Sequence, residues 1–314
     1  MEPSAQKHAR HKPFWVMIAV VLALLCVLGI ITIAHRISPT WKTRSVTEQA
    51  DALTLKSLEC NTLLDPQGTT QETRILPPEG YTRTAAGENS FAAFLRKQPV
   101  YQQGSPIYCH DGTTLSSIGY AAVYRMDTGT ANLQQCADSI IRLYSEYFLA
   151  QQMYDRIAFH TTSGFLLDYP SWRDGKRALV LGDFVTWLPL KRYDDSYATF
   201  LSYEMTVMRY AGTLSLTDES EPVALENTTI GDFFCKGGSP GHVVLIVDEA
   251  VNAEGKRCFL LGQGFMPAQS FHILQNTQTD PWYYADEITF PFRADAFSFE
   301  EHMLRRWETG FESE

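Results

Sequence analysis

Residues 231–247 read Gly-Asp-Phe-Phe-Cys-Lys-Gly-Gly-Ser-Pro-Gly-His-Val-Val-Leu-Ile-Val. An apolar run, a turn rich in glycine and proline, and a second apolar run predict two successive β-strands. The second strand opens with His242 at its mouth, where the ring is held rigidly by the backbone. Two more β-rich runs follow at 257–261 and 271–274. The C-terminal third of the chain therefore predicts an antiparallel sheet.

Helical patterns dominate the region before this sheet. Apolar side chains recur at three- and four-residue intervals over 133–153, which predicts a long helix, and a second helix is expected over 197–211. A polar cap at Asn89-Ser90 begins a short helix. Short strands are expected at 118–126 and 157–162. Helices followed by a run of strands indicate an α+β fold rather than a doubly wound one.

Cys136 lies in the first turn of the long predicted helix. The unpaired N–H groups and the dipole of a helix N-terminus stabilise a thiolate, and the same N–H groups can bind an oxyanion. A buried cysteine in a helix also behaves simply as a small apolar side chain. Cys136 is therefore a candidate nucleophile, with core packing as the alternative interpretation.

The helix-start cysteine, followed by Gly231-Asp-Phe-Phe and then the Gly241-His242 strand, resembles papain-like hydrolases of the CHAP and NlpC type. The resemblance implies that Cys136 attacks a carbonyl and that His242 acts as general base and later as general acid. Over about residues 85–290 the chain also resembles an uncharacterised bacterial membrane or secreted family of unknown function. The segments 133–138, 238–242 and 265–269 carry that second likeness.

The same resemblance implies a third polar residue on the strand after the histidine strand. Gln263 fits this place and would orient the His242 ring and fix its tautomer. Asp248 and Asn252 are the alternatives for this role. Gln135 or a first-turn N–H would serve the oxyanion, with Asp232 as a supporting residue.

The N-terminal region predicts a membrane anchor. Residues 14–34 form a stretch of 21 uncharged, mostly apolar residues, long enough to cross a hydrocarbon core of about 30 Å. A cleaved signal peptide would have a shorter apolar region and a small-residue cleavage site. We expect a cytoplasmic tail at 1–13, a juxtamembrane stalk at 35–72, and an extracytoplasmic domain at 73–314. Membrane lipid is the partner of the predicted span.

Charge and cysteine content limit the remaining possibilities. The chain has 36 acidic and 26 basic residues, a net charge of −10, which argues against nucleic-acid binding. Outside the cell, disulfides pairing Cys60 with Cys109 and Cys235 with Cys258 are one possible arrangement, and they leave Cys136 free. The histidines and Cys109 lack the short spacing of metal ligands, so no metal or other cofactor is expected.

Two functional hypotheses follow. The first is a membrane-anchored cysteine hydrolase that cleaves an amide or ester bond, with cell-wall peptides as candidate substrates. The second is a non-catalytic extracytoplasmic binding or envelope-assembly module that keeps a papain-like shell. Contact between the Cys136 sulfur and a His242 ring nitrogen distinguishes them, because a general base must lie within hydrogen-bonding reach of its nucleophile.

Overall fold

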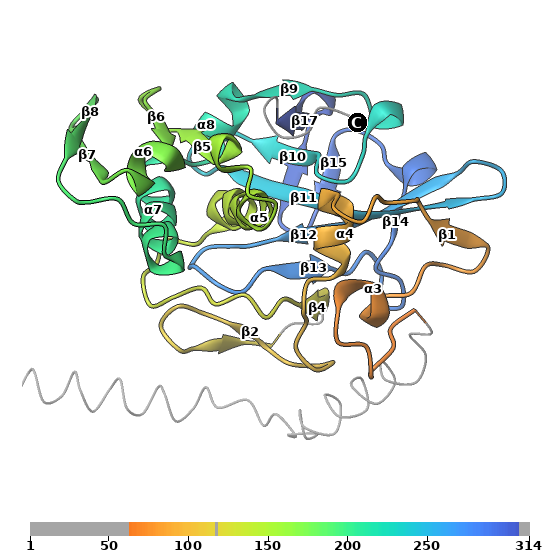
Figure 1. Ribbon diagram of the computed structural model, residues 1–314. Helices are drawn as coiled ribbons and strands as arrows, with labels where there is room; N and C mark the ends of the chain where they lie inside the picture. Colours follow the sequence, from red (N-terminus) through yellow and green to blue (C-terminus); the bar gives the residue numbers. More distant parts are fainter. Residues whose placement is uncertain (1–62, 117–118, 308–314) are drawn as a thin grey trace, which may run out of the picture. The chain divides into compact units, whose positions relative to one another are not determined.

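A nine-stranded antiparallel sheet forms the centre of the computed structural model, which describes residues 63–116 and 119–307 (Figure 1). Its main path runs β4-β13-β12-β11-β10-β17-β9, with β1 also paired to β11 and β14 to β12. These strands span Tyr81–Arg83 (β1), Tyr120–Val123 (β4), Ser220–Pro222 (β9), Phe233–Lys236 (β10), His242–Asn252 (β11), Arg257–Gln263 (β12), His272–Leu274 (β13), Tyr283–Tyr284 (β14) and Leu304–Trp307 (β17).

The helices and the smaller strand pairs surround this sheet. The helices are Gln71–Arg74 (α3), Phe91–Arg96 (α4), Cys136–Ala150 (α5), Tyr169–Arg173 (α6), Tyr197–Tyr210 (α7) and Thr213–Asp218 (α8), with 3-10 turns at Tyr154–Arg156, Leu225–Asn227, Ala285–Glu287 and Glu301–Met303. The two-stranded pairs join Ile107–Tyr108 (β2) to Thr114–Leu115 (β3), Ala158–His160 (β5) to Leu166–Asp168 (β6), Lys176–Leu181 (β7) to Phe184–Pro189 (β8), and Phe292–Ala294 (β15) to Phe297–Phe299 (β16).

The stretch that predicted two strands does form the β10–β11 hairpin. Phe233 pairs with Leu245 and Lys236 with His242. Because side chains alternate between the two faces of a strand, the hairpin contributes to two separate apolar cores. The core on the α5 side includes Phe233, Cys235, Val243, Leu245 and Val247. The core on the opposite side includes Phe234, Val244, Ile246, Phe259 and Leu261.

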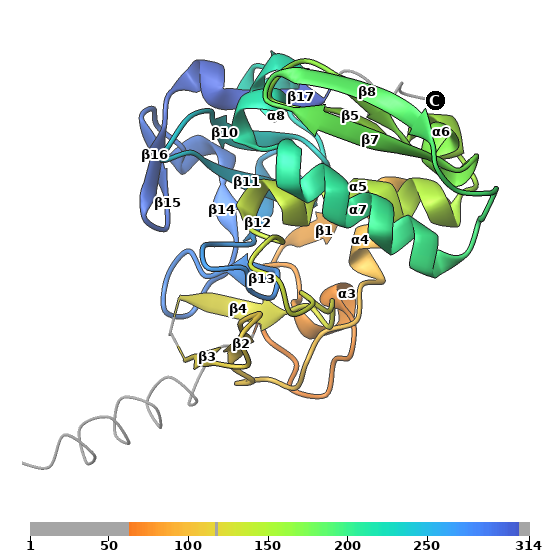
Figure 2. The same ribbon diagram turned by 90° about the vertical axis from the view of Figure 1, so that its left-hand side faces the viewer.

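Each face of the sheet has its own cover. Helix α5 packs on β11 and contacts α7, while β16 packs on β10. Figure 2 shows α5 and α7 on one side of the sheet and the β15–β16 hairpin on the other. The α+β class predicted from the sequence is confirmed, with a mostly antiparallel sheet and few helices. The sequence analysis did not anticipate the β15–β16 cover.

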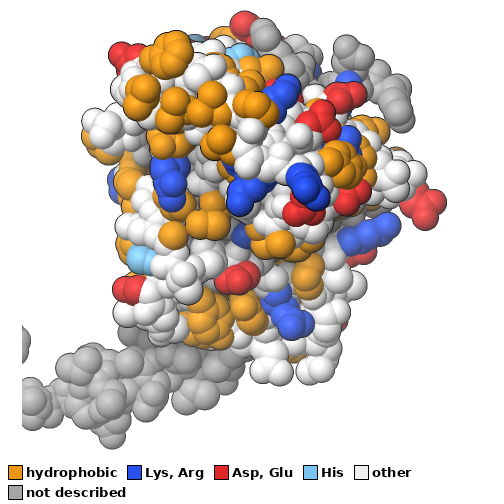
Figure 3. Space-filling view, turned by 60° about the vertical axis from the view of Figure 1, so that its left-hand side comes forward, with side chains coloured by type: hydrophobic (Ala, Val, Ile, Leu, Met, Phe, Trp, Pro, Cys, Tyr) orange, Lys and Arg blue, Asp and Glu red, His pale blue; other side chains and the backbone are white. Residues whose placement is uncertain are grey.

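The β7–β8 hairpin leaves apolar side chains in contact with solvent. Figure 3 shows hydrophobic side chains gathered on the upper part of the face on which this hairpin lies. Leu181 and Phe184, which flank its turn, are 62% and 61% exposed. Single exposed apolar residues are ordinary, but a cluster of them commonly marks a contact surface.

Several predicted elements differ in detail from the structure. The long helix begins at Cys136 rather than at residue 133, and α7 ends at Tyr210. The segment after α7 forms a helix of its own, α8, which lies beyond the helix predicted over 197–211. Strand β4 is shorter than the run predicted at 118–126, of which residue 118 lies outside the described part.

Residues 63–72, which the sequence analysis assigned to the stalk, already pack on the domain. Gln71 is fully buried and donates a hydrogen bond from Nε2 to the Val247 carbonyl at 3.1 Å. No helix among residues 63–116 and 119–307 is long and apolar enough to cross a membrane. The predicted tail, the span at 14–34 and most of the stalk lie outside the described residues.

The disulfide pairing of Cys235 with Cys258 is wrong. Cys109, Cys136, Cys235 and Cys258 are all free thiols. Cys235 lies on β10 and Cys258 on β12, and β11 runs between these two strands. The cysteines were expected on neighbouring strands, but a whole strand separates them. Cys60, the other half of the second predicted pair, lies outside the described residues.

Candidate functional site

Cys136 is the first residue of α5, as the sequence predicted, and its thiol is nearly buried. The residue is 6% exposed, and burial raises the pKa of the thiol. The backbone N–H groups of Ala137 and Val243 point toward the sulfur and act in the opposite direction, but burial dominates. Burial thus opposes the effect of the helix N-terminus, which was expected to stabilise a thiolate.

A cleft of about 370 Å³ opens beside Cys136. The start of α5, the end of α7 and the Gly238–Gly241 turn form its walls. Within this cleft, Asp138 is 6% exposed, and its Oδ2 accepts a hydrogen bond from the Gln135 backbone N–H at 3.0 Å. Its other oxygen, Oδ1, has no hydrogen-bond partner in the described part of the chain, and burial raises the pKa of the carboxyl to about 7. The Gln135 side chain instead contacts Asn132 at 3.2 Å.

The central sheet separates Cys136 from His242. Cys136 belongs to the core on the α5 side, together with Val243, the residue that follows His242 on β11. Because neighbouring residues of a strand point to opposite faces, the His242 side chain points away from α5. Its ring stacks on Phe297 of β16, with centroids 4.3 Å apart and planes 16° apart. The structure thus places the two predicted catalytic side chains on different faces.

His242 and Gln263 are brought together, at the place that the sequence analysis assigned to the glutamine. His242 Nε2 donates to Gln263 Oε1 at 2.7 Å, and Gln263 Nε2 donates to Asp295 Oδ2 at 2.8 Å. His272 Nδ1 donates to the Ser270 carbonyl at 3.1 Å, which leaves its Nε2 as an acceptor 3.3 Å from Gln263 Nε2. Burial lowers the pKa of His242, and it lowers the pKa of His272 to about 4. The cluster joins two histidine rings, one amide and the exposed Asp295 carboxylate in one hydrogen-bonded network.

The remaining candidates hold the fold together. Both Asp232 oxygens accept hydrogen bonds from Arg306, at 2.8 Å each. Asp248 is fully buried and binds two arginines, Arg83 at 2.6 Å and Arg96 at 2.7 Å. Asn252 accepts backbone N–H groups in the turn between β11 and β12. None of these three contacts orients His242.

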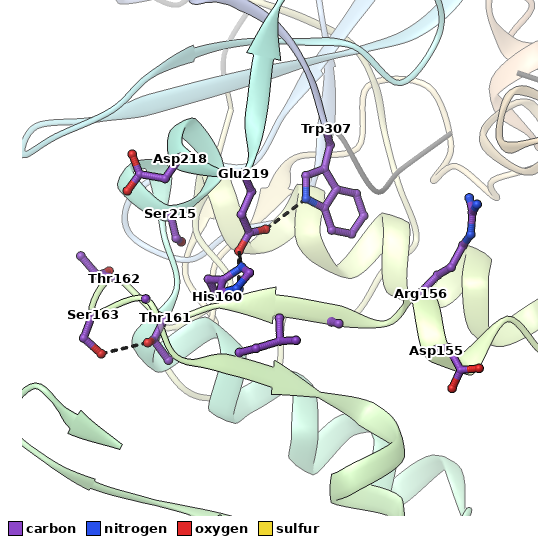
Figure 4. Close-up of a pocket in the computed structure, with 13 residues that line it drawn as sticks. Asp155, Arg156, His160, Thr161, Thr162, Ser163, Ser215, Asp218, Glu219 and Trp307 are labelled. Atoms are coloured by element: carbon purple, nitrogen blue, oxygen red, sulfur yellow. Dashed lines mark hydrogen bonds and ion pairs between the residues drawn. The ribbon is translucent and has the colours of Figure 1, made fainter. Parts of the chain in front are cut away.

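A larger pocket, of about 890 Å³, surrounds His160 (Figure 4). His160 ends β5, Glu219 follows α8, and Trp307 ends β17, so three elements distant in sequence converge here. His160 Nδ1 lies 2.9 Å from Glu219 Oε1, and Trp307 Nε1 donates to Glu219 Oε2 at 3.0 Å. Burial raises the pKa of the Glu219 carboxyl, while the hydrogen bonds that it accepts act the other way.

Sequence reasoning missed this pocket. His160 was considered only as part of a metal set, and neither Glu219 nor Trp307 was singled out. Glu219 lies 59 residues from His160 and Trp307 lies 88 residues from Glu219, so no local motif marks the group. Among residues 63–116 and 119–307, no cluster of three or more His, Cys, Asp or Glu residues could hold a metal ion.

The fold and its pockets define an α+β domain with a mostly antiparallel sheet and two clefts beside the α5 face. The chain belongs to the family described as "Domain of unknown function (4846)", whose model matches residues 71–306. This agrees with the resemblance to an uncharacterised family that the sequence suggested. Comparison with curated proteins and with solved structures found no match.

Proposed function

We propose that the protein is a ligand-binding module with a papain-like shell, in which Cys136, His242 and Gln263 do not work together as a catalytic triad. The observation that carries this proposal is the placement of Cys136 and His242 on opposite faces of the sheet. A nucleophile and its base must come within hydrogen-bonding reach, directly or through one water. Here the two side chains lie on opposite faces of β11, so the His242 ring does not face the Cys136 sulfur.

The ligand site is the cleft beside Cys136. Buried polar atoms without partners are uncommon in folded proteins and call for an explanation. Asp138 Oδ1 is such an atom, and it belongs to a residue that lines the cleft. An N–H or O–H group of a ligand would supply its missing hydrogen bond. Arg209, exposed at the end of α7, lines the same cleft and would bind a carboxylate.

A short peptide with a free carboxyl terminus satisfies both groups, because it offers backbone N–H donors and one carboxylate. Peptides of the cell wall are one source of such ligands. The predicted span at 14–34 would anchor the domain to the membrane and place this cleft outside the cytoplasm. That location forms part of the proposal, and membrane lipid would be the partner of the span.

Alkylation of Cys136 by iodoacetamide tests the proposal directly. In the full-length chain purified in mild detergent, the labelled cysteine is identified by peptide mass spectrometry at a series of pH values. We expect slow labelling that rises only above the ordinary thiol pKa, since burial raises the pKa of Cys136. The rate should be the same in His242→Ala. Rapid labelling at pH 6 that collapses in His242→Ala would overturn the proposal.

Protection of Cys136 from labelling tests the ligand class. Tri-alanine should slow the alkylation of Cys136, and tri-alanine amide, which lacks the carboxylate, should slow it less. Asp138→Asn and Arg209→Ala should each weaken the protection. Equal rates with and without peptide would show that the cleft does not bind this class of ligand.

The cysteine hydrolase remains a second candidate, because Cys136 lines a cleft and backbone N–H groups surround its sulfur. In that mechanism a ligand would have to draw His242 to the α5 face, away from Phe297 and Gln263. The labelling experiment separates the two candidates, since only a working thiolate–imidazolium pair makes the rate depend on His242.

A further inference from the structure

The His160 pocket contains a histidine whose ring is oriented by a buried carboxylate. Glu219 is mostly buried, with a side chain only 10% exposed, whereas the His160 side chain is 44% exposed. Glu219 Oε1 accepts from both the His160 backbone N–H and the ring Nδ1–H. The carboxylate therefore fixes the tautomer with the proton on Nδ1. The Nε2 lone pair is left free of this interaction.

Trp307 fixes the carboxylate in turn. Its indole N–H occupies Glu219 Oε2, and its ring is 2% exposed and stacks on Phe159 with centroids 5.0 Å apart. Residues locked by packing and outer hydrogen bonds hold a reactive group in one geometry. Trp307 thus orients Glu219, and Glu219 orients the His160 ring (Figure 4). The His160 side chain is partly exposed, and its Nε2 is not used in these contacts.

Three hydroxyl groups that line the pocket form hydrogen bonds with partners other than His160. Thr161 Oγ1 and Ser163 Oγ bond to each other at 3.0 Å, and Ser215 Oγ donates to the Gly212 carbonyl at 3.0 Å. A serine nucleophile activated by His160 is therefore not indicated. Water is the nucleophile that Nε2 can activate in this pocket.

We propose that His160 and Glu219 form a catalytic dyad that hydrolyses an ester or amide in this pocket. His160 Nε2 removes a proton from water as the water oxygen forms a bond to the carbonyl carbon. Collapse of the tetrahedral intermediate breaks the bond to the leaving group, which takes the proton back from Nε2. The products are a carboxylic acid and an alcohol or amine, with no other reactant needed.

The charges of the pocket define the substrate class. Asp155 and Asp218 line it and are exposed, and they disfavour anionic substrates. Arg156 lines the same pocket on the side away from His160 and offsets only part of this negative charge (Figure 4). The substrate class is therefore an uncharged or cationic ester or amide. This proposal goes beyond the proposed binding function and does not depend on it.

Hydrolysis of p-nitrophenyl acetate by the full-length chain in mild detergent tests the dyad. We expect hydrolysis above the buffer rate, with a normal solvent deuterium isotope effect that reports proton transfer to Nε2. His160→Gln should lower kcat/KM by about 10²-fold or more, the usual contribution of a general base. Glu219→Gln should lower kcat mainly, because the ring loses its orienting anion. Trp307→Phe should give a smaller loss.

Two matched controls complete the test. His302→Gln replaces an exposed histidine outside the pocket and should keep the wild-type rate. Cys136→Ala distinguishes the two sites, because hydrolysis that is lost in Cys136→Ala but kept in His160→Gln would belong to the cleft beside Cys136 and would overturn the dyad. Equal rates in His160→Gln and wild type, an absent isotope effect, or hydrolysis no faster than buffer would each overturn the dyad. Because His160 is largely exposed, His160→Gln stays informative even if Glu219→Gln fails to fold.

Discussion

Two groups of buried polar side chains, one on each face of the central sheet, differ in how completely they are hydrogen-bonded. On the face covered by the β15–β16 hairpin, His242, Gln263 and His272 bond to one another and to Asp295. On the face covered by α5 and α7, buried polar atoms of Gln134, Asp138 and Glu204 have no hydrogen-bond partner among the described residues.

This difference distinguishes a cluster of polar groups that stabilises the fold from a cluster that can bind a ligand. A closed network of buried polar groups gains rigidity and offers nothing to a ligand. Partnerless buried groups are costly, and a ligand that supplies the missing hydrogen bonds recovers that cost. His242, which resembled a catalytic base, therefore belongs to the face whose polar groups bond to one another. The cleft beside Cys136 belongs to the face with unpartnered buried polar atoms, which a ligand can bind.

Two adjacent residues at the end of β12 give the sharpest contrast. Gln263, its last residue, bonds to His242 and Asp295 beside the β15–β16 hairpin, whereas Gly264 lies against the start of α5. A Cβ at Gly264 would lie 2.7 Å from the Gln135 carbonyl oxygen and would also collide with Ser139. We expect Gly264→Ala to lower the free energy of unfolding by about 3 kcal/mol, since the backbone of α5 must shift. Urea unfolding followed by tryptophan fluorescence measures the loss.

Gly87→Ala is the matched control. A Cβ there meets its nearest neighbour, Ser90, only at 4.0 Å, so little change is expected. Gly264→Ala should also change the Cys136 alkylation rate, because Cys136 follows Gln135. An unchanged stability and alkylation rate would show that α5 does not pack against β12 as described.

The sequence predicted the order of elements well and the sides of the sheet not at all. The β10–β11 hairpin, the place of Cys136 in the first turn of α5 and the position of Gln263 beside His242 all follow from local patterns. The face that His242 occupies does not. The run His242–Val247 is apolar at nearly every position because the strand is buried on both faces, so it lacks the alternation that distinguishes one side from the other.

The His160 pocket could not be predicted for a different reason. Its three residues come from β5, the end of α8 and β17, and only the folded sheet brings them together. A histidine, a glutamate and a tryptophan at such separations carry no short-range signal. The sequence also did not predict the β15–β16 hairpin that covers the second core. The strands β15 and β16 are only three residues long, which is too short to show a clear alternation of apolar and polar residues.

The second test of the comparison concerns Glu204, a carboxyl of α7 that is only 1% exposed. Neither of its oxygens has a hydrogen-bond partner within residues 63–116 and 119–307, and the nearby Ser145 hydroxyl donates to the Ile141 carbonyl. Burial raises the pKa of Glu204 from 4.5 to about 8. Between these values the folded protein binds a proton that the unfolded chain releases. Stability therefore falls as pH rises from about 4.5 to about 8.

Glu204→Gln removes this titration. We expect it to raise the free energy of unfolding on the order of 2 kcal/mol at pH 8, and to have little effect at pH 5. Urea unfolding at both pH values measures the difference. Glu301→Gln, at an exposed position, should show no such pH dependence. A variant that is equally affected at pH 5 and pH 8 would show that Glu204 is already paired or ionised in the folded protein.

The smallest effect is expected on the closed face, from Gln263→Leu. Leucine fills the space of the amide but leaves the His242 Nε2–H without its acceptor, so a loss of about 1 kcal/mol follows. Asp295 is exposed, and water replaces the hydrogen bond that it loses. The Cys136 alkylation rate should stay at the wild-type value, because the sheet separates the two sites. If Gln263→Leu slowed that alkylation at pH 6, the two faces would be coupled, and the triad that the sequence suggested would again account for Cys136.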